Sequence, residues 1–329
     1  MKKSIFITGS EGFIGSHIVE KLIKKNFNIN ALVLYNSFGS IGNLELLPKK
    51  YLKKINIIFG NLQDGSTYEK YLHKNSYVIN SASLISIPYS YRASFSYFQN
   101  NLLGAHTLFN LCLKKKVKKV IHFSTSEIYG TPKKIPIDEE TPLNPQSPYA
   151  ASKASVDKLA KSFFYSYNLP VTILRPFNNF GPRQSRRAVI PEIICQSLKK
   201  NIIELGDINT KRDFLYVEDT VDAVLKVINK NKINGEEINI GSGKFYKISE
   251  VIEFISQILK KKIIIKINKK KLRPSKSEVR YLLCNPKKAK KLLNWKPSCN
   301  NKAKFIEKLK STIKHYSENY RLYNVKFYD

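Results

Sequence analysis

The sequence predicts an α/β protein built on a doubly wound parallel sheet, with a smaller α/β C-terminal domain. Three observations support this fold class. Short apolar runs alternate with helix-like segments through the first two-thirds of the 329-residue chain, which is typical of a parallel sheet with helices on both faces. A glycine-rich turn follows the first apolar run. Prolines at positions 176, 182 and 191 then mark a change in character.

The predicted strands are short apolar runs, each bounded by polar residues or glycine. They cover residues 4–8, 29–34, 56–59, 77–80, 120–123, 171–174 and 237–240. Apolar residues at helical spacing predict helices over residues 15–25, 101–115, 150–167 and 218–228. From residue 249 onward we expect a helix, an Ile-rich strand, a turn at Pro274 and a basic C-terminal helix. The carboxyl ends of parallel strands share one edge, so the loops that follow them should meet there.

The charge is strongly positive: 57 Lys and Arg against 25 Asp and Glu give a formal net charge of +32. The lysines are spread along the whole chain, and nine basic residues within 260–276 fit a solvated strand and loop. No basic tract interleaved with aromatic residues stands out. We therefore attribute the charge to an AT-rich coding bias and expect no nucleic-acid partner. A positive surface would still help to capture an anionic small substrate.

The four cysteines form no CxxC pair, and the five histidines show no metal-ligand spacing. Scattered cysteines are typical of a reducing compartment, so the expectations are a cytoplasmic protein without disulfides and without a metal site. The first apolar run is too short for a signal peptide, and no run is long enough to span a membrane. We expect no membrane partner.

Glycines at 9, 12 and 15 give the pattern G-x-x-G-x-x-G between a predicted strand and a predicted helix. Gly9 permits a tight turn, Gly12 lets the backbone approach a pyrophosphate, and Gly15 lets helix and strand pack closely. Phe13 and Ile14, which are also assigned to the cofactor, lie just before the helix predicted over residues 15–25, whose free N–H groups attract anions. This context favours a dinucleotide site over a glycine turn without a ligand.

The acid that usually follows the second strand, about 20 residues further on, is absent. Tyr35, Asn36 and Ser37 stand there instead. Asn36 or Ser37 could bond a ribose hydroxyl, and no arginine is present to hold a 2′-phosphate, so the expected cofactor is NAD. Asn61 and Leu62, after the third predicted strand, are placed to meet the adenine edge.

Tyr149 and Lys153 are four residues apart and so lie one helical turn apart on one face. A lysine ammonium beside a phenol favours the phenolate and lowers the tyrosine pKa, which makes a general base for a hydroxyl substrate. The alternative is that Tyr149 packs within the helix and Lys153 is solvated.

The segment Ser124–Glu127, which has three hydroxyl side chains and one carboxyl, follows the predicted strand at 120–123. The hydroxyl of Thr125 could share a substrate proton with Tyr149, and Glu127 could remove a carbon-bound proton. Taken alone, this segment could also be an ordinary helix-capping turn.

Together these motifs resemble the extended short-chain dehydrogenase/reductase family over nearly the whole chain. The matching residues are the glycines at 9–15, Thr125, Tyr149, Lys153, and the segments 175–178, 181–183, 212–214, 217–219 and 292–297. The resemblance implies a Rossmann-type domain, tightly held NAD and a nucleotide-activated sugar as substrate. It also implies a homodimer built on the helices near 95–114 and 149–167.

The resemblance implies two domains. Residues 1–180, with 215–245 returning to them, would bind NAD, and residues 181–214 and 246–329 would bind the nucleotide sugar. It also assigns Ala82 to the cofactor. The substrate-binding residues that it implies are Ser83, Asn101, Asn178, Arg183, Val189, Arg212 and Arg273. Arginine suits phosphate because its fork pairs two oxygens, although Arg212 could instead form a salt bridge with Asp213.

A closer resemblance is to the NAD-dependent 4,6-dehydratases of the legionaminic acid pathway. It rests on segments 34–38, 87–91, 125–127, 183–191 and 273–278. It implies UDP- or GDP-linked N-acetylglucosamine as substrate and a 4-keto-6-deoxy sugar as product. Tyr149, helped by Lys153 and Thr125, would take the O4 proton, and Glu127 would take the C5 proton before water leaves C6.

One departure stands at Ser126, where many sugar 4,6-dehydratases carry an aspartate that protonates the leaving hydroxyl. The triplet Thr-Ser-Glu also resembles UDP-glucuronate decarboxylases, which lose CO₂ instead of water. A 4-epimerase removes no proton from C5, so Glu127 would have no catalytic role in it. A non-catalytic NAD-sensing or RNA-associated protein would need no proton-relay set, so the intact set at Thr125, Glu127, Tyr149 and Lys153 argues against it.

Overall fold

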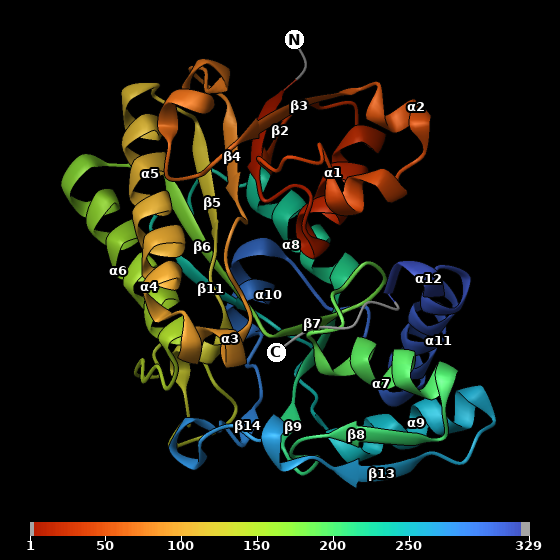
Figure 1. Ribbon diagram of the computed structural model, residues 1–329. Coiled ribbons are helices and arrows are strands. Elements are labelled where there is room, and N and C mark those ends of the chain that lie inside the picture. The colour runs from red at the N-terminus through yellow and green to blue at the C-terminus, as the bar shows by residue number, and fades with distance from the viewer. Residues whose placement is uncertain (1–2, 324–329) are drawn as a thin grey trace.

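A seven-stranded parallel sheet forms the centre of the computed structural model, which describes residues 3–323 (Figure 1). Its strand order is β11-β6-β5-β4-β1-β2-β3, and all its pairings are parallel. The strands are β1 (Ser4–Thr8), β2 (Asn28–Leu34), β3 (Ile55–Gly60), β4 (Tyr77–Asn80), β5 (Lys119–Phe123), β6 (Val171–Pro176) and β11 (Glu237–Ile240). The doubly wound parallel sheet predicted from the sequence is confirmed.

Helices cover both faces of this sheet. One face carries α1 (Phe13–Lys24), α8 (Val217–Ile228) and α10 (Lys287–Leu293); the other carries α5 (Gly104–Lys114) and α6 (Pro148–Tyr167). The side chains of β1 alternate between the two cores: Ile5 and Ile7 pack with α1 and α8, whereas Phe6 packs with α5 and α6. Both core faces of the strand are buried, which explains its continuous apolar run.

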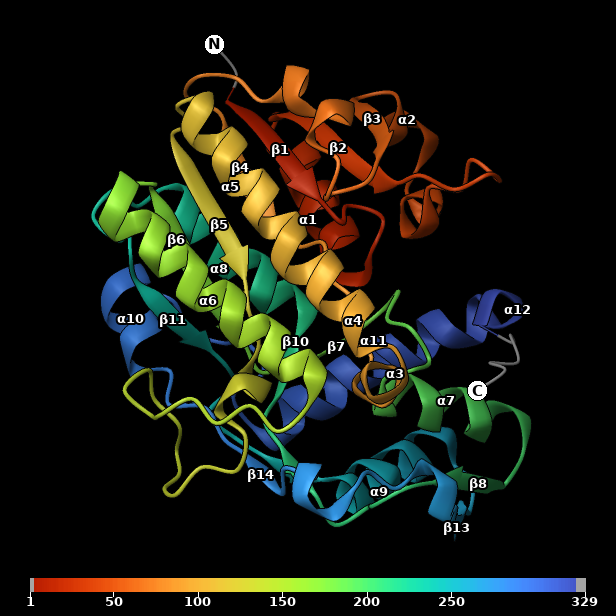
Figure 2. The ribbon, with the colours of Figure 1, turned by 60° about the vertical axis from the view of Figure 1, so that its left-hand side comes forward.

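The helix predicted to begin near residue 101 begins earlier. Helix α4 (Ser94–Tyr97) runs through a π-helical turn over Phe98–Leu103 into α5. Such turns within α-helices are frequent at functional sites. Two short helices, α2 (Lys49–Leu52) and α3 (Ile87–Arg92), lie in the connections after β2 and β4. Figure 2 shows α4, α5 and α6 running side by side.

A smaller part lies beyond the carboxyl ends of the sheet strands (Figure 2). Its helices α7 (Val189–Lys199), α9 (Ile248–Leu259), α11 (Lys302–Glu318) and α12 (Tyr320–Tyr323) pack around a separate apolar core. Its strands pair as β8 (Ile202–Leu205) with β13 (Ile264–Ile267), β7 (Asn178–Phe180) with β10 (Phe214–Tyr216), and β9 (Lys211–Arg212) with β12 (Tyr246–Lys247) and β14 (Tyr281–Leu282).

Apart from β13 these strands were not predicted, because two to four residues carry too little periodicity for a sequence pattern to reveal. The Ile-rich strand is present as β13, but it begins only at Ile264. In the described range, no helix is both long enough and apolar enough to cross a membrane. All four cysteines are free and buried.

Candidate functional site

The glycine turn between β1 and α1 is required by close packing. Gly9 has φ +63°, and a Cβ there would lie 2.7 Å from the Cα of Ala82. A Cβ on Gly15 would lie 2.1 Å from the Gly9 carbonyl oxygen. Gly12 precedes α1 without any side-chain cap, so the first N–H groups of the helix are available to an anion. The turn therefore fits the pyrophosphate of a dinucleotide.

The turn lies where the strand order reverses, between β1 and β4, which is where open α/β sheets bind ligands. Thr8 joins the two strand ends: its Oγ1 donates to Asn80 Oδ1 at 2.9 Å and accepts from Ala82 N at 3.1 Å. Ala82 is thereby held against Gly9, and Ser83 follows it. The structure thus brings Ala82 to the glycine turn, whereas the Ser83 hydroxyl donates to the neighbouring Leu84 carbonyl at 3.2 Å.

The residues predicted to meet the adenosine are differently placed. The Asn36 side chain closes its own loop, with Oδ1 accepting from Ser40 N at 3.0 Å and Nδ2 donating to Ser40 O at 2.9 Å. The Leu62 side chain is buried in the core against Gly104. Asn61 accepts a bond from the backbone two residues on. Ser37 stays a predicted ribose contact.

Tyr149 and Lys153 lie in the first turns of α6, which Ser147 caps by accepting from Ala150 N at 3.1 Å. Both side chains are buried. Lys153 Nζ donates to the Phe123 carbonyl at 2.6 Å.

The pKa of Tyr149 differs from the sequence expectation. Burial raises it, while a side-chain hydrogen bond with Thr125 lowers it. Burial also lowers the pKa of Lys153 to about 8. Desolvation of the phenolate outweighs the expected help from Lys153, because both groups are buried. Tyr149 therefore needs a further positive charge nearby to act as a base.

Glu127 lies beside this pair, in a short 3₁₀ turn after β5. Thr125 Oγ1 accepts from Glu127 N at 3.3 Å, so Thr125 caps the turn as well as facing Tyr149. Glu127 is 8% exposed and Ser126 is 2% exposed. The helix-capping and the catalytic interpretations of this segment are thus compatible, because the cap fixes the backbone that carries Glu127.

Arg212 and Arg273 converge on Glu278; we call these three residues the arginine cluster. Arg212 Nη2 lies 3.1 Å from Glu278 Oε1, and Arg273 Nη1 lies 3.6 Å from it. Arg273 Nη1 also lies 4.0 Å from Glu127 Oε2. The cluster therefore adjoins the proton-transfer residues.

The alternative partner for Arg212 is not found. Asp213 accepts instead from the backbone N–H groups of Ser242, Gly243 and Cys284, at 2.7, 2.9 and 3.1 Å.

The other predicted substrate residues are dispersed. Asn178 begins β7, and its Oδ1 is buried without a hydrogen-bond partner among the described residues. Val189 is the first residue of α7. The Asn101 side chain is already hydrogen-bonded within the protein: it accepts from Leu84 N at 2.9 Å and donates to Ser152 Oγ at 3.0 Å. It therefore ties the loop after β4 to α6.

Arg183 is not part of the arginine cluster. It pairs with Glu20 of α1 at 2.5 Å. Its backbone carbonyl accepts from Asn43 Nδ2 at 3.1 Å, and the Pro182 carbonyl lies 3.0 Å from His17 Nε2. We call these three contacts the 182–183 clasp. They join the segment after β7 to the elements that surround the glycine turn.

Sequence reasoning missed two features of the site. Tyr97 is buried, and its ring lies 6.2 Å from that of Tyr149 at 78°. Asp157, one turn beyond Lys153 on α6, bonds Arg175 Nε at 2.9 Å. An acid four residues after Lys153 was the available signal for this second feature.

Comparison with known proteins shows the family. The family model for GDP-mannose 4,6 dehydratase matches residues 6–307. The dTDP-D-glucose 4,6-dehydratase of Homo sapiens is 32% identical over 332 residues, covering 97% of this chain and 91% of that protein.

Two solved structures share the fold and most of the length. The UDP-N-acetylglucosamine 4-epimerase from Methanobrevibacter ruminantium M1, in complex with UDP-N-acetylmuramic acid, is 34% identical with a TM-score of 0.85, covering 97% of this chain and 100% of that one. The dTDP-glucose 4,6-dehydratase from Bacillus anthracis str. Ames, in complex with NAD, is 28% identical with a TM-score of 0.84, covering 98% of each chain. With the glycine turn fitted to a dinucleotide, NAD is the cofactor, and the chain belongs to the GDP-mannose 4,6-dehydratase family, the nucleotide-sugar dehydratases and epimerases of the extended short-chain dehydrogenases/reductases.

Proposed function

We propose that this enzyme is a 4,6-dehydratase acting on UDP- or GDP-linked N-acetylglucosamine. The observation that carries the dehydratase assignment is the buried Glu127 carboxylate beside Thr125 and Tyr149. Oxidation at C4 needs only the tyrosine, whereas elimination of water also needs a base for the C5 proton. The N-acetylglucosamine and legionaminic-type assignments are supported by segments 87–91 and 273–278 of the sequence.

In this proposal each residue moves one proton at a stated atom. Bound NAD supplies the hydride acceptor at C4, the hydride donor at C6, and a positive ring that favours the Tyr149 phenolate. Tyr149 takes the proton from O4, with Thr125 sharing it. Glu127 takes the proton from C5 as the C6–O bond breaks. Ser126 is a poor acid, so protonated Glu127 gives its proton to the leaving hydroxyl and water departs. When the hydride is returned to C6, C5 must regain a proton; this is the O4 proton held by Tyr149, delivered through Glu127, so that both side chains end in their starting states.

The arginine cluster is the proposed site of the substrate diphosphate. Two guanidinium groups share one carboxylate there, which is the arrangement that a phosphate can replace. Asn178 and Val189 would complete the site. In this division residues 1–180 and 215–245 hold NAD, and residues 181–214 and 246–329 hold the nucleotide sugar, except that α10 packs back on the central sheet. Arg183 then acts through the 182–183 clasp rather than on the diphosphate.

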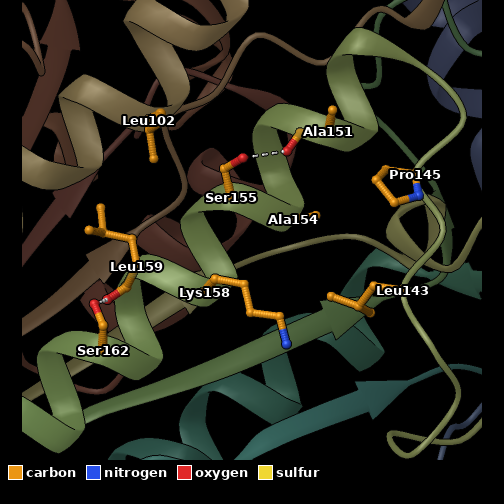
Figure 3. Close-up of a pocket in the computed structure, with 9 residues that line it drawn as sticks. All are labelled: Leu102, Leu143, Pro145, Ala151, Ala154, Ser155, Lys158, Leu159 and Ser162. Atoms are coloured by element: carbon orange, nitrogen blue, oxygen red, sulfur yellow. Dashed lines mark hydrogen bonds between the residues drawn. The ribbon is translucent and has the colours of Figure 1, made fainter.

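A second copy of this chain is the proposed partner, docked on α6. Figure 3 shows a groove on this helix, where Leu102 and Leu143 flank a row of small residues that includes Ala151 and Ser155. Small side chains let two helices approach closely. Nearby, Phe95 is 70% exposed. Light scattering should give a dimer, and Ser155→Arg should give a folded monomer; a native monomer would contradict the proposal.

A 4-epimerase is the second candidate. The M. ruminantium structure, at 34% identity, is an epimerase, and Ser126 leaves the site without the usual second acid. A UDP-glucuronate decarboxylase is the third, because the Thr-Ser-Glu triplet resembles that group as well.

Mass spectrometry of parallel reactions separates these functions. The substrates are UDP-N-acetylglucosamine, GDP-N-acetylglucosamine, UDP-glucose and UDP-glucuronate. Loss of one water from an N-acetylhexosamine nucleotide would support the proposal and identify the base. Loss of CO₂ from the glucuronate would reassign Glu127. Unchanged masses in every reaction would contradict both, and NMR would then test for epimerisation.

A further inference from the structure

The end of β2 lacks the acid that holds the adenosine ribose in many dinucleotide-binding proteins. Asn36, the nearest polar side chain in the sequence there, uses both its amide oxygen and its amide nitrogen to close the 36–40 loop. Apart from the Ser37 hydroxyl, a polar contact at this place therefore has to come from a side chain of another segment.

Glu11 reaches this place from the glycine turn. It stands between Gly9 and Gly12, and its Oε1 accepts from Leu34 N, the last residue of β2, at 3.0 Å. Its own carbonyl accepts from Asn43 N at 2.9 Å. A Cβ on Gly42 would lie 3.2 Å from the Glu11 Cβ. The hydrogen bonds from Leu34 N and Asn43 N thus hold Glu11 in place, with its side-chain carboxylate at the C-terminal end of β2.

The second oxygen of this carboxylate has no partner. Glu11 Oε2 is buried and accepts no hydrogen bond from any described residue, and burial raises the Glu11 pKa. A buried acceptor without a donor is costly, so it gains from a donor that a ligand supplies. A ribose hydroxyl is such a donor, and the glycine turn that carries Glu11 is the one that fits the pyrophosphate of the same dinucleotide.

We propose that Glu11 binds the adenosine ribose of NAD through its hydroxyls and excludes NADP. An ionised carboxylate only accepts hydrogen bonds, so it suits a 2′-hydroxyl. A 2′-phosphate would add nearly two negative charges beside it. A chain with a net charge of +32 would otherwise attract the more anionic dinucleotide, so discrimination must come from a local negative charge. Glu11 supplies that charge from the glycine turn in place of an acid after β2.

Cofactor exchange tests the proposal without any sugar. The purified holoenzyme is incubated with an equal mixture of labelled NAD and NADP until the labelled fraction of its bound nucleotide no longer rises, freed of unbound nucleotide, and analysed for bound nucleotide by mass spectrometry. The native protein should retain NAD over NADP by at least about 100-fold. Glu11→Gln keeps the size and the acceptor for Leu34 N but removes the charge. The substitution should lower the ratio of retained NAD to retained NADP at least about 10-fold, because repulsion between the 2′-phosphate and the carboxylate weakens NADP binding by more than that factor.

Glu45→Gln is the matched control. Glu45 lies in the 3₁₀ turn Gly42–Leu46, where its carboxylate accepts from Ser40 and Ile41, so its neutralisation should leave the ratio unchanged. Glu11→Asp keeps the charge and should still exclude NADP even if it holds NAD more weakly. An unchanged ratio in a folded Glu11→Gln protein, an equal loss of both nucleotides, or NADP retention by Glu11→Asp would overturn the proposal. The dehydratase assignment is tested separately by the sugar reactions.

Discussion

The glycine turn and the arginine cluster are assembled from the chain in opposite ways. The turn is one segment of consecutive residues from Thr8 to Gly15, and its shape follows from backbone contacts within itself and with Ala82. The cluster joins Arg212 of β9 to Arg273 and Glu278, which stand more than sixty residues later. A local site depends on which residues can adopt a backbone shape, whereas a dispersed site depends on the whole fold. The two should therefore respond differently to substitution.

Gly15→Ala should have the largest effect, because the new Cβ would lie 2.1 Å from a backbone oxygen that cannot move aside. We expect a loss of more than about 4 kcal/mol in the free energy of unfolding, or protein without NAD. Urea unfolding and bound-nucleotide analysis measure both. Gly39→Ala is the control: it has open space but φ +63°, so it should cost only about 1 kcal/mol. Native stability in Gly15→Ala would show that the turn is not rigid.

Glu127→Gln tests the proposed proton transfer next to the cluster. Turnover to the dehydrated sugar should fall about 1,000-fold, since the amide cannot take the C5 proton. Oxidation at C4 should persist, so reduced cofactor should accumulate on the enzyme and be visible by its absorbance. Glu69→Gln, an acid that pairs with Lys114 and Lys115, is the control. Unchanged turnover would remove Glu127 from the mechanism.

Arg273→Gln probes the dispersed site. One of the two proposed diphosphate ligands is lost, so KM should rise about 30-fold with the NAD content unchanged. Steady-state kinetics with the substrate found by mass spectrometry measure this rise, and Arg321→Gln in α12 should leave KM at its native value. A change in kcat alone would indicate that Arg273 acts on Glu127 rather than on the diphosphate.

His17, on α1 directly after the glycine turn, is part of the 182–183 clasp and not of the arginine cluster, and it gives the smallest predicted effect. Burial and the nearby Arg183 lower its pKa to about 4, with Glu20 opposing and His315 adding to the shift. The unfolded chain, with an ordinary histidine pKa near 6.5, then binds the proton first as pH falls, so stability is lost between about pH 6.5 and 4. Relative to His17→Gln, the native protein should lose about 1 kcal/mol between pH 7.5 and 5.5 in urea unfolding. The same change of unfolding free energy with pH in the native protein and in His17→Gln would contradict this prediction.

The same contrast explains what the sequence could predict. The central sheet follows from apolar runs with turn residues between them, and the glycine turn from the spacing of three glycines. The pairing of Arg212 with Glu278 could not be predicted, because no local pattern links residues 66 positions apart. Asn36 was assigned to the ribose by its position after β2, but its amide satisfies its own loop. The hydrogen bond from Leu34 N to Glu11 could not be predicted either, because the Glu11 side chain reaches the end of β2 from another segment.

The 182–183 clasp bears on how the enzyme depends on the metabolic state of its cell. Through His17, Asn43 and Glu20 it fastens a segment of the smaller part over the elements that carry the glycine turn. In the proposed reaction, as in an epimerisation, the hydride is returned within the same turnover, so the dinucleotide never has to leave. A resident cofactor held behind such a fastening would make output insensitive to the cellular balance of oxidised and reduced NAD. The flow of sugar through this enzyme would then follow substrate supply alone.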